Sequence, residues 1–291
     1  KDMPLERENW KYKVIPARKL WTLTRLSFEL LKKQPKLDIF FSPTHYLPFS
    51  SPSKSVISIL DVSYLHFPNM FAKKDLYKLK FWGELSIKKA KKIITISNSS
   101  KSDIIKKYGI NSDKVIVVYP GVKQASSTAY PANPADRQVL SMDKLREKFG
   151  IEKKYILFVG TLQPRKNIVR LVDAFSRIVT NDIRINSNDD SSNSRSLQLV
   201  IVGKKGWQYE EILKAPEKYG VKDKVKFLDS VSNEDLPSFY QYAEFFILPS
   251  LYEGFGLPIL EAMNYGCPVI TSNVSSLPEA GEDAVLYVDP K

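Results

Sequence analysis

Short runs of apolar and β-branched residues recur along the chain, and longer stretches of mixed apolar and polar residues separate them. Such short runs are typical of strands that are buried on both faces of a parallel sheet. They predict strands at 37–42, 55–60, 92–96, 114–118, 155–159, 197–202, 245–248 and 268–271. The apolar spacing between them predicts helices at 76–89, 99–108, 168–179 and 234–242. Strands that alternate with helices indicate an α/β fold with parallel sheets.

Two polar stretches interrupt this pattern. Residues 123–140 are rich in Ser, Ala and Pro, and they predict a linker between a domain at 1–122 and a domain at 141–291. The length of 291 residues suits two domains. Residues 180–196 contain the letters NSNDDSSNS and lack the apolar residues that pack in a core. They predict a surface insertion between a helix and a strand.

The segment 17–33 carries leucines at helical spacing among Arg and Lys side chains. This pattern fits a helix on a membrane surface, and it also fits a helix that packs on the core. We favour the packing helix, because the segment leads into the predicted strand at 37–42.

The composition is that of an ordinary globular protein, with 43% apolar and 26% charged residues, which excludes wholesale disorder, collagen and coiled coils. The single cysteine, Cys267, excludes a disulfide framework within the chain and fits a reducing compartment. No apolar run approaches the roughly 20 residues that span a bilayer, and we identify no signal peptide. Because the first residue is Lys1, we expect the sequence to begin inside a longer gene product.

The net charge of +12 is unevenly distributed. Residues 1–122 hold 23 of the 44 Lys and Arg but only 10 of the 32 Asp and Glu. The positive excess therefore lies in the N-terminal part, which suggests an anionic partner there. Nucleic acid, an anionic membrane surface and a phosphorylated substrate each fit, and so does a solvated lysine-rich surface without a partner.

The sequence lacks the residues or motifs of several common kinds of site. The two histidines, His45 and His66, and one cysteine cannot supply a standard Cys/His zinc site. No G-x-S-x-G sequence is present for a serine nucleophile. The letters GKKG at 203–206 lack the spacing of a phosphate-binding Walker loop and indicate a turn.

Chemistry-bearing residues gather in the letters PSLYEGFGLPILEAMNYGCP. Glu253 follows the predicted strand at 245–248, and Gly254 and Gly256 then permit close approach of the backbone to a ligand. The predicted helix at 257–265 would present a positive N-terminus that suits a phosphate.

Glu261 lies eight residues after Glu253, on the body of that helix. The two carboxylates therefore need not form an acid–base pair, and they could grip different parts of one long ligand. The alternative is a capped helix with two surface glutamates.

The letters YILFVGTLQPRKN place two cations between a strand and a helix. The strand ends at Gly160, and Arg165 and Lys166 precede the helix. Arg offers a planar fork for phosphate oxygens and Lys offers a point charge, so the pair could clamp a diphosphate. Two exposed loop cations without a ligand are the alternative.

Together these segments resemble the family 4 retaining glycosyltransferases, whose GT-B fold consists of two facing Rossmann-like domains. The match runs from about residue 15 to 290, and its most specific part is EGFGLPILE at 253–261, the E-x7-E motif of the family. GTLQPRKN at 160–167 matches the G-x-L-x-x-x-K loop. Weaker matches are DIFFSPTHYLP, SILDVSYLHFP, ITISNSSKSDI and VVYPGV. The resemblance implies a GT-B fold with both domains incomplete.

The resemblance also implies roles for these residues. Glu253 would hold hydroxyls of a donor sugar, and Glu261 would bind the ribose hydroxyls of the nucleotide. Arg165 and Lys166 would neutralise the diphosphate leaving group, with no metal and no cofactor. The leaving phosphate would accept the proton of the acceptor, which gives retention of configuration without a carboxylate nucleophile. The remaining donor-binding residues would be Gly160, Gly254, Phe255, Gly256 and Leu257.

The acceptor side departs from the family pattern. In many relatives a histidine that contacts the donor sugar directly precedes the aspartate that corresponds to Asp61. This chain has Leu60 at that position. From the resemblance we expect the given sequence to lack the opening strand and glycine-rich loop of the first domain, and we expect relatives to continue beyond the position of residue 290. We assign Asp61 and His45 to the acceptor side, and a loop histidine without a function is the alternative for His45.

The leading hypothesis is a cytoplasmic enzyme that transfers a hexose in cell-surface polysaccharide synthesis. We favour mannose from a GDP- or UDP-linked donor, and a glycan or lipid-linked acceptor. The basic N-terminal domain suits a phosphorylated lipid carrier or peripheral contact with an anionic inner leaflet. The rival is a non-catalytic sugar-nucleotide-binding or scaffold protein, motivated by Leu60.

A third hypothesis is a nucleic-acid-binding protein that uses the basic half. Tyr77, Phe81 and Trp82 alternate with lysines, as in a stacking surface for bases. Their helical spacing predicts core positions instead, so we expect no nucleic-acid partner.

Overall fold

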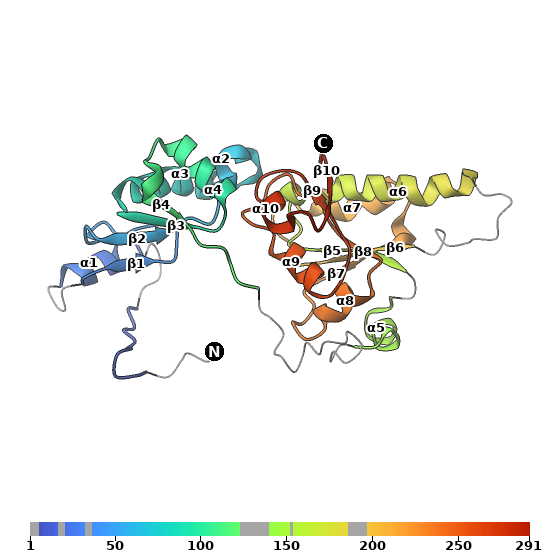
Figure 1. Ribbon diagram of the computed structural model, residues 1–291, viewed down its shortest axis with the longest axis horizontal. Helices are drawn as coiled ribbons and strands as arrows, with labels where there is room; N and C mark the ends of the chain where they lie inside the picture. The colour runs from blue at the N-terminus through green and yellow to red at the C-terminus, as the bar shows by residue number, and fades with distance from the viewer. Residues whose placement is uncertain (1–5, 17–20, 33–36, 123–139, 152–153, 186–196) are drawn as a thin grey trace.

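The computed structural model describes residues 6–16, 21–32, 37–122, 140–151, 154–185 and 197–291, and it contains two parallel sheets in two lobes (Figure 1). The predicted linker at 123–140 lies outside the described residues except for Leu140, and so does 186–196 of the predicted insertion. The domain boundaries at 122 and 141 stay predictions.

The N-terminal lobe is built on a four-stranded sheet of order β1-β2-β3-β4. Its strands are β1 (Phe40–Ser42), β2 (Ser55–Ser58), β3 (Lys92–Thr95) and β4 (Val115–Val117). Its helices are α1 (Arg25–Leu31), α2 (Ser63–His66), η1 (Pro68–Met70), α3 (Lys73–Lys89), α4 (Asn98–Tyr108) and η2 (Ser112–Lys114). Ile57 and Ile93 of neighbouring strands are fully buried in its core, as β-branched residues of a central parallel sheet should be.

The C-terminal lobe is built on a six-stranded parallel sheet of order β10-β9-β8-β5-β6-β7. Its strands are β5 (Tyr155–Val159), β6 (Gln198–Val202), β7 (Val225–Leu228), β8 (Phe245–Leu248), β9 (Val269–Ser272) and β10 (Leu286–Val288). Its helices are α5 (Met142–Phe149), η4 (Pro164–Lys166), α6 (Ile168–Ile185), α7 (Glu210–Lys218), η5 (Lys222–Lys224), α8 (Leu236–Tyr242), α9 (Leu257–Asn264) and α10 (Leu277–Gly281).

The strand order reverses beside β5. The chain runs from β5 to β6 and β7, and it then returns to place β8 on the other side of β5. The loops that leave the carboxyl ends of β5 and β8 therefore start from neighbouring strands at the point where the strand order reverses. Ligands of open α/β sheets bind at such a switch point.

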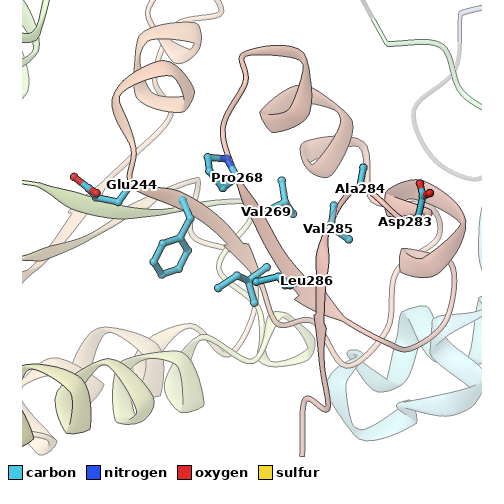
Figure 2. A pocket seen from close by; sticks show the side chains of 9 residues that line it. Glu244, Pro268, Val269, Asp283, Ala284, Val285 and Leu286 are labelled. Atoms are coloured by element: carbon cyan, nitrogen blue, oxygen red, sulfur yellow. The ribbon is translucent and has the colours of Figure 1, made fainter.

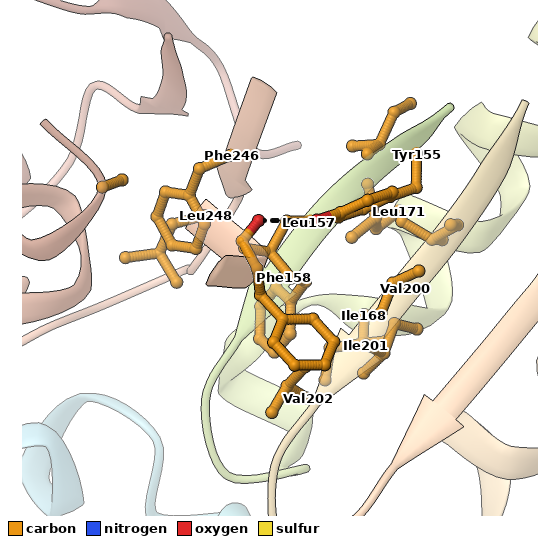
Figure 3. Packing of buried hydrophobic residues seen from close by; sticks show 14 of the residues in the cluster. Tyr155, Leu157, Phe158, Ile168, Leu171, Val200, Ile201, Val202, Phe246 and Leu248 are labelled. Atoms are coloured by element: carbon orange, nitrogen blue, oxygen red, sulfur yellow. Dashed lines mark hydrogen bonds between the residues drawn. The ribbon is translucent and has the colours of Figure 1, made fainter. Parts of the chain in front are cut away.

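The C-terminal core is the larger of the two buried clusters. Figure 3 shows Leu157 and Phe158 of β5 packed beside Val200 and Ile201 of β6. Leu171 of α6 closes the cluster from one side of the sheet. This rigid sheet fixes the ends of β5 and β8, where the candidate site lies.

Every strand that the apolar pattern predicts is present, with ends shifted by up to three residues. The pattern misses β7 and β10, which are the two edge strands of the larger sheet. All four β7 residues are only half-buried, and β10 has exposed Leu286 and Val288, so neither carries a continuous buried run. Among the described helices, the pattern also misses α2, α5, α7 and α10.

Three expectations about helices need correction. The amphipathic segment 17–33 forms a helix only at Arg25–Leu31, and 17–20 and 33–36 lie outside the described residues. Helix α6 continues to Ile185, so the first six residues of the predicted insertion at 180–196 are helical. The predicted core positions of Tyr77 and Phe81 are wrong, because their exposed fractions are 64% and 46% on the outer face of α3.

Candidate active site

Two loops meet at the switch point. One follows β5 and includes η4, and the other follows β8 and carries Glu253. The amide of Leu251 donates to the carbonyl of Arg165 at 2.8 Å, which ties the loops together. Asn167 ends η4 with a φ of 60°, a conformation that Asn tolerates, and its amide group donates to the carbonyl of Pro249 at 3.1 Å. These bonds hold Arg165 and Lys166 beside Glu253, although the two loops are far apart in the sequence.

Glu253 is enclosed by donors. Lys166 Nζ donates to its Oε1 at 2.5 Å, and Arg165 Nη1 donates to its Oε2 at 3.1 Å. The Ser250 hydroxyl also donates to Oε1, at 2.6 Å. The exposed fractions of the Lys166, Arg165 and Glu253 side chains are 11%, 17% and 8%. The alternative of solvated loop cations and a surface glutamate at 253 is therefore wrong.

The charge state of this cluster follows from two opposing effects. Burial alone would raise the pKa of Glu253, but Lys166 and Arg165 outweigh burial and hold the pKa below its usual value. The carboxylate is therefore ionised at neutral pH. Two cations beside one carboxylate leave a net positive charge at the end of the sheet.

The backbone of Glu253 is also fixed. Its amide donates to the Ser275 hydroxyl at 2.9 Å, and its carbonyl accepts from the Ser276 hydroxyl at 2.9 Å. These two serines follow β9, the strand next to β8. Neither they nor Ser250 are among the residues predicted from the sequence. The signal that could have found them is that carboxyl ends of neighbouring parallel strands meet at one edge.

The two glycines after Glu253 have separate structural reasons. A Cβ atom on Gly254 would lie 3.3 Å from Asp61 and from Ile96, so glycine lets this loop touch the N-terminal lobe. Gly256 precedes α9 with a φ of 109°, and a Cβ there would lie 3.0 Å from Leu277. The glycines that were predicted to allow close approach therefore allow it between parts of this chain.

The other residues that were predicted to bind the donor are Gly160, Phe255 and Leu257, and they have different surroundings. A Cβ on Gly160 would lie 3.7 Å from Lys166 Cε, which places Gly160 under that side chain. Phe255 lies between Gly254 and Gly256, its ring 5.5 Å from that of Tyr119. Leu257 begins α9 and is 38% exposed.

Glu261 lies apart from Glu253, on α9, as its spacing predicted. The hydroxyl of Tyr240 donates to Glu261 Oε2 at 2.8 Å. Glu261 and Tyr240 line a cavity of about 280 Å³. The other lining residues are Val122, Asn233, Leu236, Pro237, Asn264 and Tyr265.

The N-terminal lobe brings Asp61 and His45 together. His45 Nε2 lies 3.5 Å from the carbonyl of Asp61, whose Oδ1 accepts from the Ser63 amide at 2.8 Å. Burial lowers the pKa of His45 and outweighs the opposing charge of Asp61. His45 is therefore neutral at pH 7. Asp61 also faces Gly254, so the pair that was assigned to the acceptor side from the sequence borders the loop of Glu253.

A further cavity of about 370 Å³ lies at the amino ends of the strands, opposite the carboxyl ends where Glu253 lies (Figure 2). Glu244 and Phe245 line it where β8 begins, and Pro268 and Val269 line it where β9 begins. Because ligands of parallel sheets bind at the carboxyl ends of the strands, this cavity is not the candidate site.

Two absences hold over the described residues. No group of three or more His, Cys, Asp or Glu there is arranged to hold a metal ion. Within the same part of the chain, no helix has the length and apolar character needed to cross a membrane.

Curated relatives match most of the chain. O-antigen chain mannosyltransferase B of Escherichia coli is 32% identical over 276 residues, which are 94% of this chain and 65% of that protein. O-antigen chain mannosyltransferase RfbU of Salmonella typhimurium is 28% identical over 80% of this chain and 56% of that protein. The serotype-specific mannosyltransferase WbdA of E. coli is 30% identical over 77% of this chain and 25% of that protein. The chain thus spans less than two thirds of each.

Solved structures share the fold. WaaG, described as a glycosyltransferase involved in lipopolysaccharide biosynthesis, superposes with a TM-score of 0.64 at 19% identity, over 94% of this chain and 72% of its own. A sucrose-phosphate synthase from Thermosynechococcus elongatus gives a TM-score of 0.63 at 18% identity, over 96% and 68%. Identity this low shows the fold alone, and the GT-B expectation is confirmed.

Two family models divide the chain between them. The model described as Glycosyltransferase Family 4 matches residues 6–125. The model described as Glycosyl transferases group 1 matches residues 141–291. The second match covers more than half of the chain and includes the whole Glu253 cluster, so the chain belongs to the family of Glycosyl transferases group 1.

Proposed function

We propose that this chain carries the donor site of a retaining hexosyltransferase that takes mannose from a nucleotide diphosphate sugar. The acceptor is a glycan or a lipid-linked glycan in cell-surface polysaccharide synthesis. The observation that carries the proposal is the buried cluster of Glu253, Arg165 and Lys166 at the carboxyl ends of β5 and β8. The names of the relatives support mannose, because three of them are mannosyltransferases.

The cluster has the charge that the reaction needs. A nucleotide diphosphate gains negative charge as its bond to the sugar breaks. Arg165 and Lys166 are already fixed before the donor arrives, so they stabilise that charge without reorganising. In this proposal the two cations do the work of a metal ion.

Glu253 serves the sugar in this proposal. Its carboxylate is ionised and can accept hydrogen bonds from sugar hydroxyls. Three donors already hold it, which makes it a poor nucleophile. The leaving phosphate therefore takes the proton of the acceptor on the same face, and configuration is retained. Glu261 binds the ribose from its position on α9.

The outer face of α3 supports contact with an anionic membrane. Tyr77, Phe81 and Leu85 stand at intervals of four residues and are 64%, 46% and 46% exposed. Exposed lysines, Lys74 and Lys88, extend the row at both ends. Aromatic and aliphatic residues between lysines are typical of a helix that lies on an anionic bilayer. Such a surface would bring the acceptor side to a lipid-linked glycan.

Thermal stability in the presence of nucleotides tests the donor site. We expect GDP, UDP or ADP, or one of their sugar conjugates, to raise the Tm selectively. The variant Glu261→Ala should lose much of that shift. The control Glu244→Ala removes a carboxylate at the amino ends of the strands, and this variant should keep the full Tm shift. If no nucleotide shifts the Tm, the donor-site proposal fails.

Turnover then separates the enzyme from a scaffold of the same fold. Release of the nucleotide diphosphate from the stabilising donor would support the enzyme. Binding without turnover would favour the scaffold, for which Leu60 is the motivating residue. A salt-dependent shift of an oligonucleotide would instead favour nucleic-acid binding.

A further inference from the structure

Helix α4 of the N-terminal lobe lies against the loop of Glu253. The helix begins after Ser97, whose hydroxyl accepts from the Ser100 amide, and it ends at Gly109 in the left-handed conformation. Its first amides, at Asn98 and Ser99, donate to the Glu279 carboxylate of the other lobe at 2.7 and 2.6 Å. One element therefore contacts the C-terminal lobe at its start.

A second contact lies further along the same helix, at Asp103. The Tyr252 hydroxyl donates to Asp103 Oδ2 at 2.8 Å, and His66 Nε2 lies 2.9 Å from the same oxygen. The rings of His66 and Tyr252 stack with centroids 5.0 Å apart and planes 28° apart. Tyr252 is only 5% exposed, so its side chain is enclosed by the opposite lobe.

Tyr252 also touches the candidate site directly. It precedes Glu253, and its carbonyl accepts from Arg165 Nη1 at 2.7 Å. The same Nη1 donates to Glu253 Oε2 at 3.1 Å. The side chain of Tyr252 thus contacts the N-terminal lobe, and its backbone carbonyl binds Arg165.

We propose that Asp103 is a positioning residue that acts across the two lobes. It holds the Tyr252 hydroxyl, and the Tyr252 carbonyl then sets the guanidinium of Arg165 against Glu253. The position of Arg165 against Glu253 consequently depends on the two lobes being together. This inference rests on the proposed function for its effect on catalysis, while the mechanical link between Asp103 and the loop stands without it.

The direction of the hydrogen bond agrees with this role. Burial raises the pKa of Tyr252 well above its usual value, and the charge of Asp103 raises it further. The hydroxyl therefore stays protonated and donates to the carboxylate. A hydrogen bond from a neutral hydroxyl to a carboxylate is stronger than one between two neutral groups.

Hydrogen exchange in the full chain without ligand tests whether Asp103 holds the loop of Glu253 in place. We expect the amides of 250–256 to exchange about tenfold faster in Asp103→Ala than in the unaltered protein. Asp103→Asn keeps an acceptor oxygen and should stay close to the unaltered protein. The control Lys107→Ala alters an exposed residue of the same helix and should change nothing. Unchanged exchange in Asp103→Ala would overturn the proposal, and equal increases in both Asp103 variants would contradict the hydrogen bond as its means.

The second partner gives an independent check. Tyr252→Phe removes the hydroxyl and keeps the ring on His66, so it should raise exchange as Asp103→Ala does. The double variant should exchange no faster than the faster of the two single variants, because the bond between Asp103 and Tyr252 is already absent from each. Additive increases would show that the two residues act separately and would overturn the proposal.

Steady-state kinetics tests the effect on the site. We expect kcat of Asp103→Ala to fall about tenfold and the KM for the donor to change far less, since Arg165 acts on charge that develops during the reaction. Asp103→Asn should recover most of kcat. Faster exchange with unchanged kcat would overturn the positioning role. If the unaltered chain shows no turnover, the proposed function fails, and the exchange comparison still decides the link between the lobes.

Discussion

Lys166 Nζ and Glu253 Oε1 lie 2.5 Å apart, although 86 residues separate them in the chain and they follow different strands of the sheet. Both side chains are about nine-tenths buried. Bringing two charges out of water costs free energy that their mutual attraction only partly returns. The pair therefore indicates a functional arrangement more than a source of stability.

Removing one partner of this pair should destabilise the fold strongly. We expect Lys166→Met to lower the free energy of unfolding by about 3 kcal/mol, because Glu253 stays buried with one cation fewer. The double variant Lys166→Met/Glu253→Gln should lose less than the two single losses combined. Lys154→Met is the control, since its pair with Glu244 is half exposed, and it should cost less than about 1 kcal/mol. Denaturant unfolding compares the unaltered protein with the single variants Lys166→Met, Glu253→Gln and Lys154→Met and with the double variant. Equal losses in Lys166→Met and Lys154→Met would contradict the buried pair.

Two glycines with left-handed backbones should respond differently to alanine. Gly109 has a φ of 60°, and no atom lies within 4 Å of the position that a Cβ would take, so Gly109→Ala should cost about 1 kcal/mol of conformational strain. Gly256 has a φ of 109°, and its Cβ would also crowd Leu277 at 3.0 Å. Gly256→Ala should therefore cost clearly more, about 2–3 kcal/mol, by denaturant unfolding. A smaller loss at Gly256 would show that the start of α9 yields easily.

The sequence predicts the site where the signal is local, and it fails where the signal depends on neighbouring strands. The loop position of Glu253 and the helix position of Glu261 follow from an apolar run and a helical stretch beside them. Ser275 and Ser276 belong to another strand, and only the sheet order brings them to Glu253.

The same limit explains the errors in the fold. Central strands bury both faces and show continuous apolar runs, whereas the edge strands β7 and β10 do not. On α3, the spacing of four residues between Tyr77 and Phe81 indicates that the two side chains share one face of the helix. Spacing alone cannot say whether that face meets the core or the solvent, and here it meets the solvent.

Stability should depend on pH through His45. Burial lowers the pKa of this imidazole below 6.5, despite the nearby charge of Asp61. The unfolded chain then binds a proton at a higher pH than the folded chain, so the free energy of unfolding should fall as the pH drops below about 6.5. His45→Gln should flatten the curve in that window, and His66→Gln measures the contribution of the other histidine. An unaltered slope in His45→Gln would contradict the burial argument.

Vesicle binding should depend on the outer face of α3. We expect the full chain to sediment with vesicles that contain phosphatidylglycerol, and to bind less at high salt or to neutral phosphatidylcholine vesicles. The double variant Tyr77→Ser/Phe81→Ser should weaken binding by about tenfold or more, because both rings lose their burial in the bilayer interface. Phe41→Ser is the matched control, since this ring is 51% exposed on β1 of the same lobe. Equal losses in the control, or no binding to anionic vesicles, would show that α3 faces something other than a membrane.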